Sequence, residues 1–191
     1  MTLVSTETEP TRHPAPQASL AVTEEEANPH EVAEQLHRLL ANTYRVYNST
    51  QMAHWNVEGP HFASLHAMFE DQYEKLAEAI DRIAERIRAI GFFVNGGLSH
   101  LAEFSAPQPV VVTGSPERLM SDLLRQHQHT ITELRLMLRT AQDARDDVTA
   151  DMLIDRMTWH EDAVWTLRST LGKRSSSIRP TPGFQQGNKQ P

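Results

Sequence analysis

The positions of proline and glycine divide this chain more sharply than any other feature. Neither residue occurs in three stretches: 30–58, 61–90 and 117–171. Because proline and glycine are the residues that most often interrupt helices, each stretch is a candidate for a long helix. Asp146 and Asp147 are typical helix-capping residues inside the third stretch, so we expect two helices there, divided near residue 145. The chain is therefore predicted to be all-α.

Start and stop signals mark the ends of these stretches. Asn28 and Ser115 each precede a proline, which places a capping residue before a proline at the first helical position. Gly59 and Gly91 stand where the first and second helices should end. The turn after Gly59 is short, so the first two helices are expected to be antiparallel neighbours.

Apolar residues recur at helical spacing in each stretch. On the second helix they are Phe69, Tyr73, Leu76, Ile80, Ile83, Ile87 and Ile90. The same steps of three and four residues occur in 120–138 and in 153–171. Because each helix has one apolar stripe to bury, we expect a four-helix bundle. Residues 91–114 form a long crossover, with room for a short helix around 98–105.

Composition narrows the class of protein. The 191 residues include 25 Asp and Glu against 18 Lys and Arg, a formal net charge of −7, which argues against a general nucleic-acid coat. Cysteine is absent, so disulfides, thiolate metal sites and cysteine nucleophiles are excluded. No apolar run approaches the ~18 residues of a membrane span, and no basic-then-apolar segment opens the chain. We expect a soluble, cytoplasmic protein.

The two ends of the chain carry opposite charge. Residues 1–29 hold five Glu and one Arg, whereas 173–191 hold four basic residues and no acid. Both segments are expected to be flexible tails. The predicted organisation is one domain, 30–172, between an acidic N-terminal tail and a basic C-terminal tail.

Two histidines flank the first predicted turn. His54 and His66 lie six residues on either side of Pro60, so a helical hairpin brings them to the same level. Two imidazoles at one level are a starting point for a metal site. The ordinary alternative is two unrelated histidines near a loop.

Three acids follow on the same face of the second helix as His66. At 100° per residue, Glu70, Asp81 and Glu85 lie about 40°, 60° and 100° from His66, away from the apolar stripe. A solvated charged face is the common interpretation of such acids. The same wedge also carries small residues that would let another helix approach closely: Ala63, Ala67, Ala77 and Ala84.

These positions are symmetric about the middle of the helix. His66 and Glu85 are equally distant from a point between residues 75 and 76, as are Glu70 and Asp81. Within one chain His66 and Glu85 are about 28 Å apart, too far to share a metal. A twofold axis through that point brings His66 and Glu70 of one copy to Asp81 and Glu85 of another. Dimers with such a twofold axis are the commonest oligomers, and they need this kind of self-complementary surface. We therefore expect two shared sites per dimer.

The ligand types indicate a metal of intermediate hardness. Imidazole and carboxylate without thiolate suit Fe(II), Mn(II) or Zn(II). Three carboxylates per site can compensate charge as iron passes from +2 to +3, so iron is favoured. Spacing alone does not exclude zinc.

The same residues resemble a known family. HWNVEG at 54–59 and LHAMFE at 65–70 resemble the first signature of the Dps family, the mini-ferritins named for DNA protection during starvation. DRIAER at 81–86 resembles the second signature. The resemblance extends more loosely over about 30–172.

The resemblance implies a ferritin-like bundle assembled as a hollow shell of twelve subunits. It implies a two-iron ferroxidase centre at the dimer interface, with His54, His66 and Glu70 from one chain and Asp81 and Glu85 from the other. Position 70 is often Asp in the family and is Glu here. By the same resemblance, Fe(II) is oxidised with hydrogen peroxide preferred over oxygen, and ferric mineral is stored, which protects DNA from oxidative damage.

Two further features of the family have candidates in this chain. Trp55 resembles the tryptophan beside the ferroxidase centre, with interface packing as its alternative role. The family has an acidic pore for incoming iron on its threefold axes. Asp147 and Asp151, one helical turn apart, are candidates for that pore, with helix capping as the alternative.

Other interpretations stay open from the sequence alone. The main alternative is a DNA-binding or compacting shell with weak or no iron oxidation, acting at the nucleoid through the basic tail. A zinc-bound shell without redox activity is another. A single-chain di-iron oxygenase or manganese catalase is disfavoured. Such proteins carry Glu-x-x-His on two helices, whereas Glu34-x-x-His37 is intact here and Glu58-x-x-His61 is broken by Gly-Pro.

Two more histidines lie on apolar stripes. His127 and His160 are expected to be core residues, with a site inside the bundle as the alternative.

Overall fold

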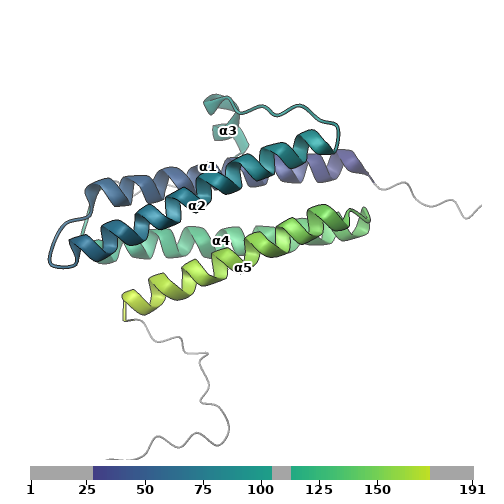
Figure 1. The fold of residues 1–191 in the computed structure, drawn as a ribbon. Coiled ribbons are helices and arrows are strands. Elements are labelled where there is room, and N and C mark those ends of the chain that lie inside the picture. Colours follow the sequence, from purple (N-terminus) through teal and green to yellow (C-terminus); the bar gives the residue numbers. More distant parts are fainter. Residues whose placement is uncertain (1–27, 105–112, 173–191) are drawn as a thin grey trace, which may run out of the picture.

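Five helices account for most of the computed structural model, which describes residues 28–104 and 113–172. They are α1 (Pro29–Asn56), α2 (Phe62–Ala89), α3 (Leu98–Phe104), α4 (Pro116–Asp143) and α5 (Asp147–Thr170). Helices α1 and α2 form one antiparallel pair, α4 and α5 form another, and the two pairs pack against each other (Figure 1). The predicted four-helix bundle with a short helix in its crossover is confirmed.

The two predicted tails lie outside the described residues. Of the N-terminal tail only its last two residues are described, and of the C-terminal tail none. Within the described ranges, no helix is both long enough and apolar enough to cross a membrane.

Capping side chains hold two of the helix starts. Asn28 Oδ1 accepts a hydrogen bond from the His30 N–H (3.2 Å), and Asp146 Oδ1 accepts one from the Thr149 N–H (3.0 Å). Both residues satisfy N–H groups that a helix start leaves without partners. Ser115 precedes α4 as predicted, but its side chain makes no capping hydrogen bond to that helix.

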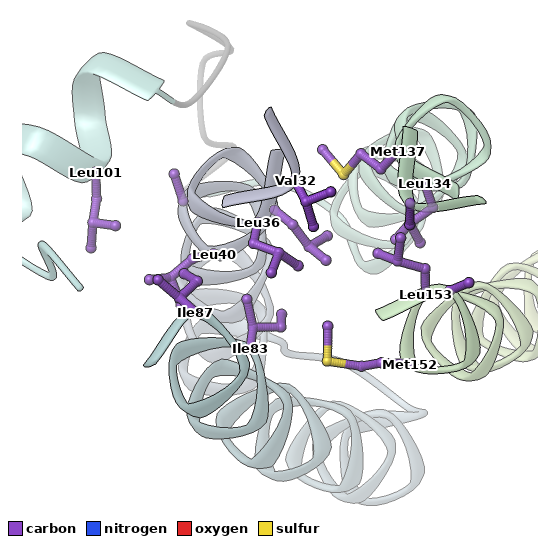
Figure 2. Close-up of a cluster of buried hydrophobic side chains, with 14 residues drawn as sticks. Val32, Leu36, Leu40, Ile83, Ile87, Leu101, Leu134, Met137, Met152 and Leu153 are labelled. Carbon is purple, nitrogen blue, oxygen red and sulfur yellow. The ribbon is translucent and has the colours of Figure 1, made fainter. Parts of the chain in front are cut away.

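The apolar core consists of two clusters towards opposite ends of the bundle. One joins the first half of α1 to the end of α2 and the α4–α5 junction, and Figure 2 shows Leu36, Ile83 and Leu153 within it. The other contains Phe69 of α2 and Leu167 of α5. Helix α3 in the crossover packs onto the first cluster through Leu101 (Figure 2).

Each of the four long helices also buries polar side chains. They include Ser49, Thr50, Gln72, Gln126, His127, Thr130, Arg156 and His160. The two histidines are fully buried, with their Nδ1 atoms 2.8 Å apart. Neither Nε2 atom has a hydrogen-bond partner within the described residues. Both are thus core residues, as the sequence predicts.

Burial keeps this histidine pair neutral. Burial, followed by the charge of Arg156, lowers the pKa of His127 to about 3. Burial, His127 and Arg156 together lower the pKa of His160 well below its usual value. Arg156 itself lies over the Trp159 ring, with Cζ 4.7 Å from the ring centroid. Because an unfolded chain would titrate both histidines normally, the pair links stability to pH.

We expect the free energy of unfolding to fall as the pH drops below about 6.5, because the unfolded chain then binds two protons that the folded chain excludes. For each histidine the slope approaches about 1.4 kcal/mol per pH unit. Denaturant titrations between about pH 7 and pH 5 measure this slope. The double variant His127→Gln/His160→Gln should flatten it, and His129→Gln should not. Equal slopes in all three proteins would show that the pair does not govern acid stability.

Candidate metal centre

The turn between α1 and α2 brings His54 and His66 together. Gly59 adopts φ +104°, a left-handed conformation that side chains rarely tolerate, and its carbonyl accepts a hydrogen bond from the Phe62 N–H (3.0 Å). The two imidazole rings stack with centroids 3.7 Å apart and planes inclined by 20°. The histidines therefore lie at the same level, as their spacing about the turn predicts.

Each imidazole is held by the backbone of the opposite helix. His54 Nδ1 donates to the His66 carbonyl oxygen at 2.9 Å, and His66 Nδ1 donates to the His54 carbonyl oxygen at 2.9 Å. A carbonyl oxygen only accepts hydrogen bonds, so in a neutral imidazole the proton resides on Nδ1 and the lone pair on Nε2. This is the tautomer that metal-binding histidines use when the other nitrogen is anchored.

Aromatic rings support the histidine pair on both sides. Phe62 stacks on His66 with ring centroids 4.9 Å apart. Tyr73 meets His54 edge-on, with centroids 5.2 Å apart at 78°. Burial, followed by the carboxylates of Glu70 and Glu74, raises the pKa of Tyr73, so its phenol is protonated at neutral pH. From the sequence, Tyr73 is predicted only as a member of the apolar stripe of α2. Tyr73 is half-buried, whereas Phe69, one turn earlier on that stripe, is fully buried.

The three predicted acids are exposed on α2. Glu70 lies one helical turn from His66, whereas Asp81 and Glu85 follow about 22 Å and 28 Å along the helix. Within the described part of a single chain, no three histidine or acidic side chains come close enough to hold a metal ion. One chain thus joins the two histidines and leaves Asp81 and Glu85 far from them.

Large apolar side chains are exposed near the histidine pair in the single chain. Trp55 is 64% exposed and Phe62 is 46% exposed, although both are large aromatic residues. Ala63 and Ala67 are exposed nearby on α2, and Ala77 is exposed further along the same helix. Exposed large apolar side chains favour an interaction surface. The small alanine side chains allow a second helix to approach closely.

The far end of α2 is tied to the start of α5. Arg86 donates to Asp146 Oδ1 at 2.5 Å and to Thr149 Oγ1 at 2.8 Å. Burial opposes ionisation of Asp146, but the hydrogen bonds from Thr149 and the Arg86 charge outweigh it and lower the pKa of this carboxyl. The predicted capping role of this residue is thereby combined with an ion pair.

A cleft of about 300 Å³ lies beside this ion pair. Its lining includes Glu85 of α2 and Asp151 of α5, together with Arg82, Arg86 and Met152. The two candidate pore residues, Asp147 and Asp151, are exposed one turn apart at the start of α5. The cleft therefore places one candidate pore acid and one candidate metal ligand on the same surface.

Comparisons with known proteins agree on one family. A family model described as a ferritin-like domain matches residues 33–176. The chain is 35% identical over 163 residues to an uncharacterized low temperature-induced protein of Nostoc, covering 82% of this chain and 87% of that one. It is 31% identical over 143 residues to DNA protection during starvation protein 2 of Bacillus anthracis, covering 75% and 98%.

A solved structure shows the same fold. The Dps protein of Vibrio cholerae O1 superposes with a TM-score of 0.72 at 28% identity, covering 75% of this chain and 90% of that chain. That protein is described as a member of a broad superfamily of ferritin-like diiron-carboxylate proteins. The fold and the sequence relationship thus coincide over the described bundle.

Replacing Gly59 tests whether the turn that brings the two histidines together depends on a left-handed backbone conformation. A Cβ at Gly59 would meet nothing within 4 Å, so Gly59→Ala adds backbone strain without a clash. We expect it to lower the free energy of unfolding by about 1–2 kcal/mol in denaturant titrations. Gly96→Ala is the control, because Gly96 also has open space around it but no positive φ. Equal stabilities for the two variants would contradict the role assigned to the turn.

Proposed function

The chain belongs to the Dps family of ferritin-like proteins, and from this premise we propose that it oxidises Fe(II) and stores the ferric product inside a homo-oligomeric shell. Membership of this family supports iron storage and DNA protection in general terms. A hollow shell is consistent with the Dps relatives, and we propose twelve subunits built from twofold dimers. The proposed location is the cytoplasm.

The orientation of the two imidazoles carries this proposal. His54 and His66 each donate Nδ1–H to a backbone carbonyl, which leaves both Nε2 lone pairs for a metal ion. Glu70, one turn from His66, adds a hard oxygen ligand on the same face. Nitrogen and oxygen donors without thiolate suit Fe(II), and Zn(II) fits the same set as a substitute.

A second chain supplies the remaining ligands in this proposal. Asp81 and Glu85 of the partner subunit face His54, His66 and Glu70 across a twofold axis near the middle of α2. The exposed alanines of α2 and the exposed Trp55 ring support such an interface, because an assembly would bury them. Each dimer then has two identical two-iron sites, and Trp55 lies beside one of them.

The chemistry proposed at each site is a two-electron reaction. Two Fe(II) ions give one electron each to hydrogen peroxide, and with two protons the products are two Fe(III) ions and two water molecules. The imidazoles and carboxylates hold the two ions close together, and the three carboxylates offset the charge that the ions gain. Because both electrons reach one peroxide molecule, no hydroxyl radical is released, which protects DNA.

We propose that incoming iron passes the acidic residues at the start of α5. Asp147 and Asp151 are exposed there, and clustered carboxylates attract Fe(II) by focusing the electrostatic field. Asp151 also lines one cleft with Glu85, a proposed metal ligand.

We expect Asp81→Asn to slow Fe(II) oxidation at least about tenfold, because it removes one proposed ligand from every site. The protein is loaded anaerobically with Fe(II), peroxide or oxygen is added, and ferric absorbance is followed over time. Asp71→Asn is the matched control, since Asp71 is an exposed acid on the same helix that pairs with Lys75. Size-exclusion chromatography establishes that both variants assemble as the parent does. An unchanged rate in Asp81→Asn would refute the ligand assignment.

The second candidate function is DNA binding by a shell with weak or no iron oxidation. It is favoured by the basic segment 173–191, which lies outside the described residues, and by the relatives named for DNA protection. If this function holds, deleting 173–191 removes DNA binding in a gel-shift assay. Raising the salt concentration should weaken the binding of the full chain. Oxidation no faster than in buffer would make this candidate the leading one, and bound zinc found by metal analysis would explain the silent site.

A further inference from the structure

A row of aromatic rings leads from the histidine pair into the seam between α1 and α2. The Tyr73 ring meets the His54 ring edge-on at a centroid distance of 5.2 Å. The Tyr47 ring meets the Tyr73 ring in the same way, at 6.2 Å and 89°. Gln51 Nε2 donates a hydrogen bond to the Tyr47 hydroxyl at 3.0 Å, which fixes the last ring of the row. Two oxidisable phenols therefore lie in sequence behind a proposed metal ligand.

The other tyrosine and the nearby tryptophan are placed differently. The chain has three tyrosines, and the third, Tyr44, packs against the apolar cluster at the opposite end of α1. In the single chain Trp55 is largely exposed, on the surface proposed to face the partner, whereas Tyr73 and Tyr47 are half-buried in the seam of one subunit. Of these residues, Tyr73 is the one whose ring contacts a histidine of the pair. A half-buried ring is also shielded from reductants in solution.

The reduction of hydrogen peroxide is a reaction in which these phenols could supply an electron. Reducing hydrogen peroxide to water takes two electrons, and a site that holds a single Fe(II) supplies one. One-electron reduction leaves a hydroxyl radical, which damages any molecule nearby. Singly loaded sites predominate whenever iron is scarce relative to protein, so a second electron donor in the protein would prevent this damage.

We propose that Tyr73 supplies the second electron when a site holds one Fe(II), and that Tyr47 shares the oxidised state that results. This inference rests on the proposed ferroxidase function. One Fe(II), one tyrosine phenol, one hydrogen peroxide and one proton from solvent give one Fe(III), one tyrosyl radical and two water molecules. The phenol loses an electron and a proton, and the O–O bond of peroxide is broken.

A later Fe(II) restores the resting protein. It gives one electron to the tyrosyl radical, which takes up a proton and becomes a phenol again, while the iron becomes Fe(III). Over both steps two Fe(II) ions and one peroxide molecule are consumed, as in a doubly loaded site. Tyr73 thus acts as an electron store that allows the two ions to arrive one after the other.

Freeze-quench electron paramagnetic resonance of the assembled protein tests this inference. The protein is loaded anaerobically with one Fe(II) per chain, mixed with one equivalent of hydrogen peroxide and frozen. We expect a tyrosyl radical signal that narrows when ring-deuterated tyrosine is incorporated. Tyr73→Phe keeps the ring and its packing but should lose the signal, and the yield of hydroxyl radical in a spin-trapping assay should rise. Tyr44→Phe is the matched control and should behave as the parent.

The outcomes separate this inference from the proposed function on which it rests. Rapid iron oxidation with the same radical signal in Tyr73→Phe, with a signal from tryptophan, or with no signal in the parent overturns the role of Tyr73 and leaves the ferroxidase function intact. Absence of rapid iron oxidation in the parent protein overturns the ferroxidase function and this inference with it.

Discussion

Four long helices, each with one apolar stripe, have to bury all four stripes in one core, and this constraint decides what remains outside. On α2 the stripe through Phe69, Leu76 and Ile83 turns inward and is fully buried. The wedge that carries His66 and Glu85 therefore cannot face the core, because it lies on another side of the same helix. Within one chain His54 of α1 reaches His66, but Asp81 and Glu85 lie far along α2 from both histidines. The proposal therefore has a second chain supply these two acids.

The histidines inside the bundle and those at its edge differ in how well their surroundings accommodate positive charge. In the middle of the bundle, burial and Arg156 lower the pKa of His127 to about 3, so this site disfavours a proton and would disfavour a metal cation for the same reason. At the edge, His54 and His66 are anchored through Nδ1, and exposed carboxylates lie on the same face of α2. The proposed iron site accordingly uses the histidines at the edge of the bundle and not the neutral pair at its centre.

Local signals in the sequence were sufficient for most of the fold. Helices begin or end at Asn28, Gly59 and Asp146, as the capping and turn chemistry of these residues predicts. The spacing of His54 and His66 about the turn predicts that they lie at the same level, and their rings stack. Other features depend on distances across the bundle, which periodicity on one helix does not contain. The Nδ1 contact between His127 and His160 joins α4 to α5, and the edge-on contact of Tyr73 with His54 joins α2 to α1. The hydrogen bonds that set the tautomer of His54 and His66 could not be predicted either, because every residue has a backbone carbonyl and the sequence does not show which one accepts. The roles of Asp81 and Glu85 as partner ligands stay a prediction, because the described residues of a single chain do not bring them to the histidines.

Co-assembly of two inactive chains tests most directly whether each site is shared. One chain carries His54→Ala and the other carries Asp81→Ala, and both are mixed before the shell assembles. In a mixed dimer, one site then combines intact histidines from one chain with intact acids from the other, while its second site carries both changes. Shared sites predict that Fe(II) oxidation returns in the mixed shells and is absent from shells of either chain alone. Mixed shells as inactive as their components would contradict the claim that each site is shared.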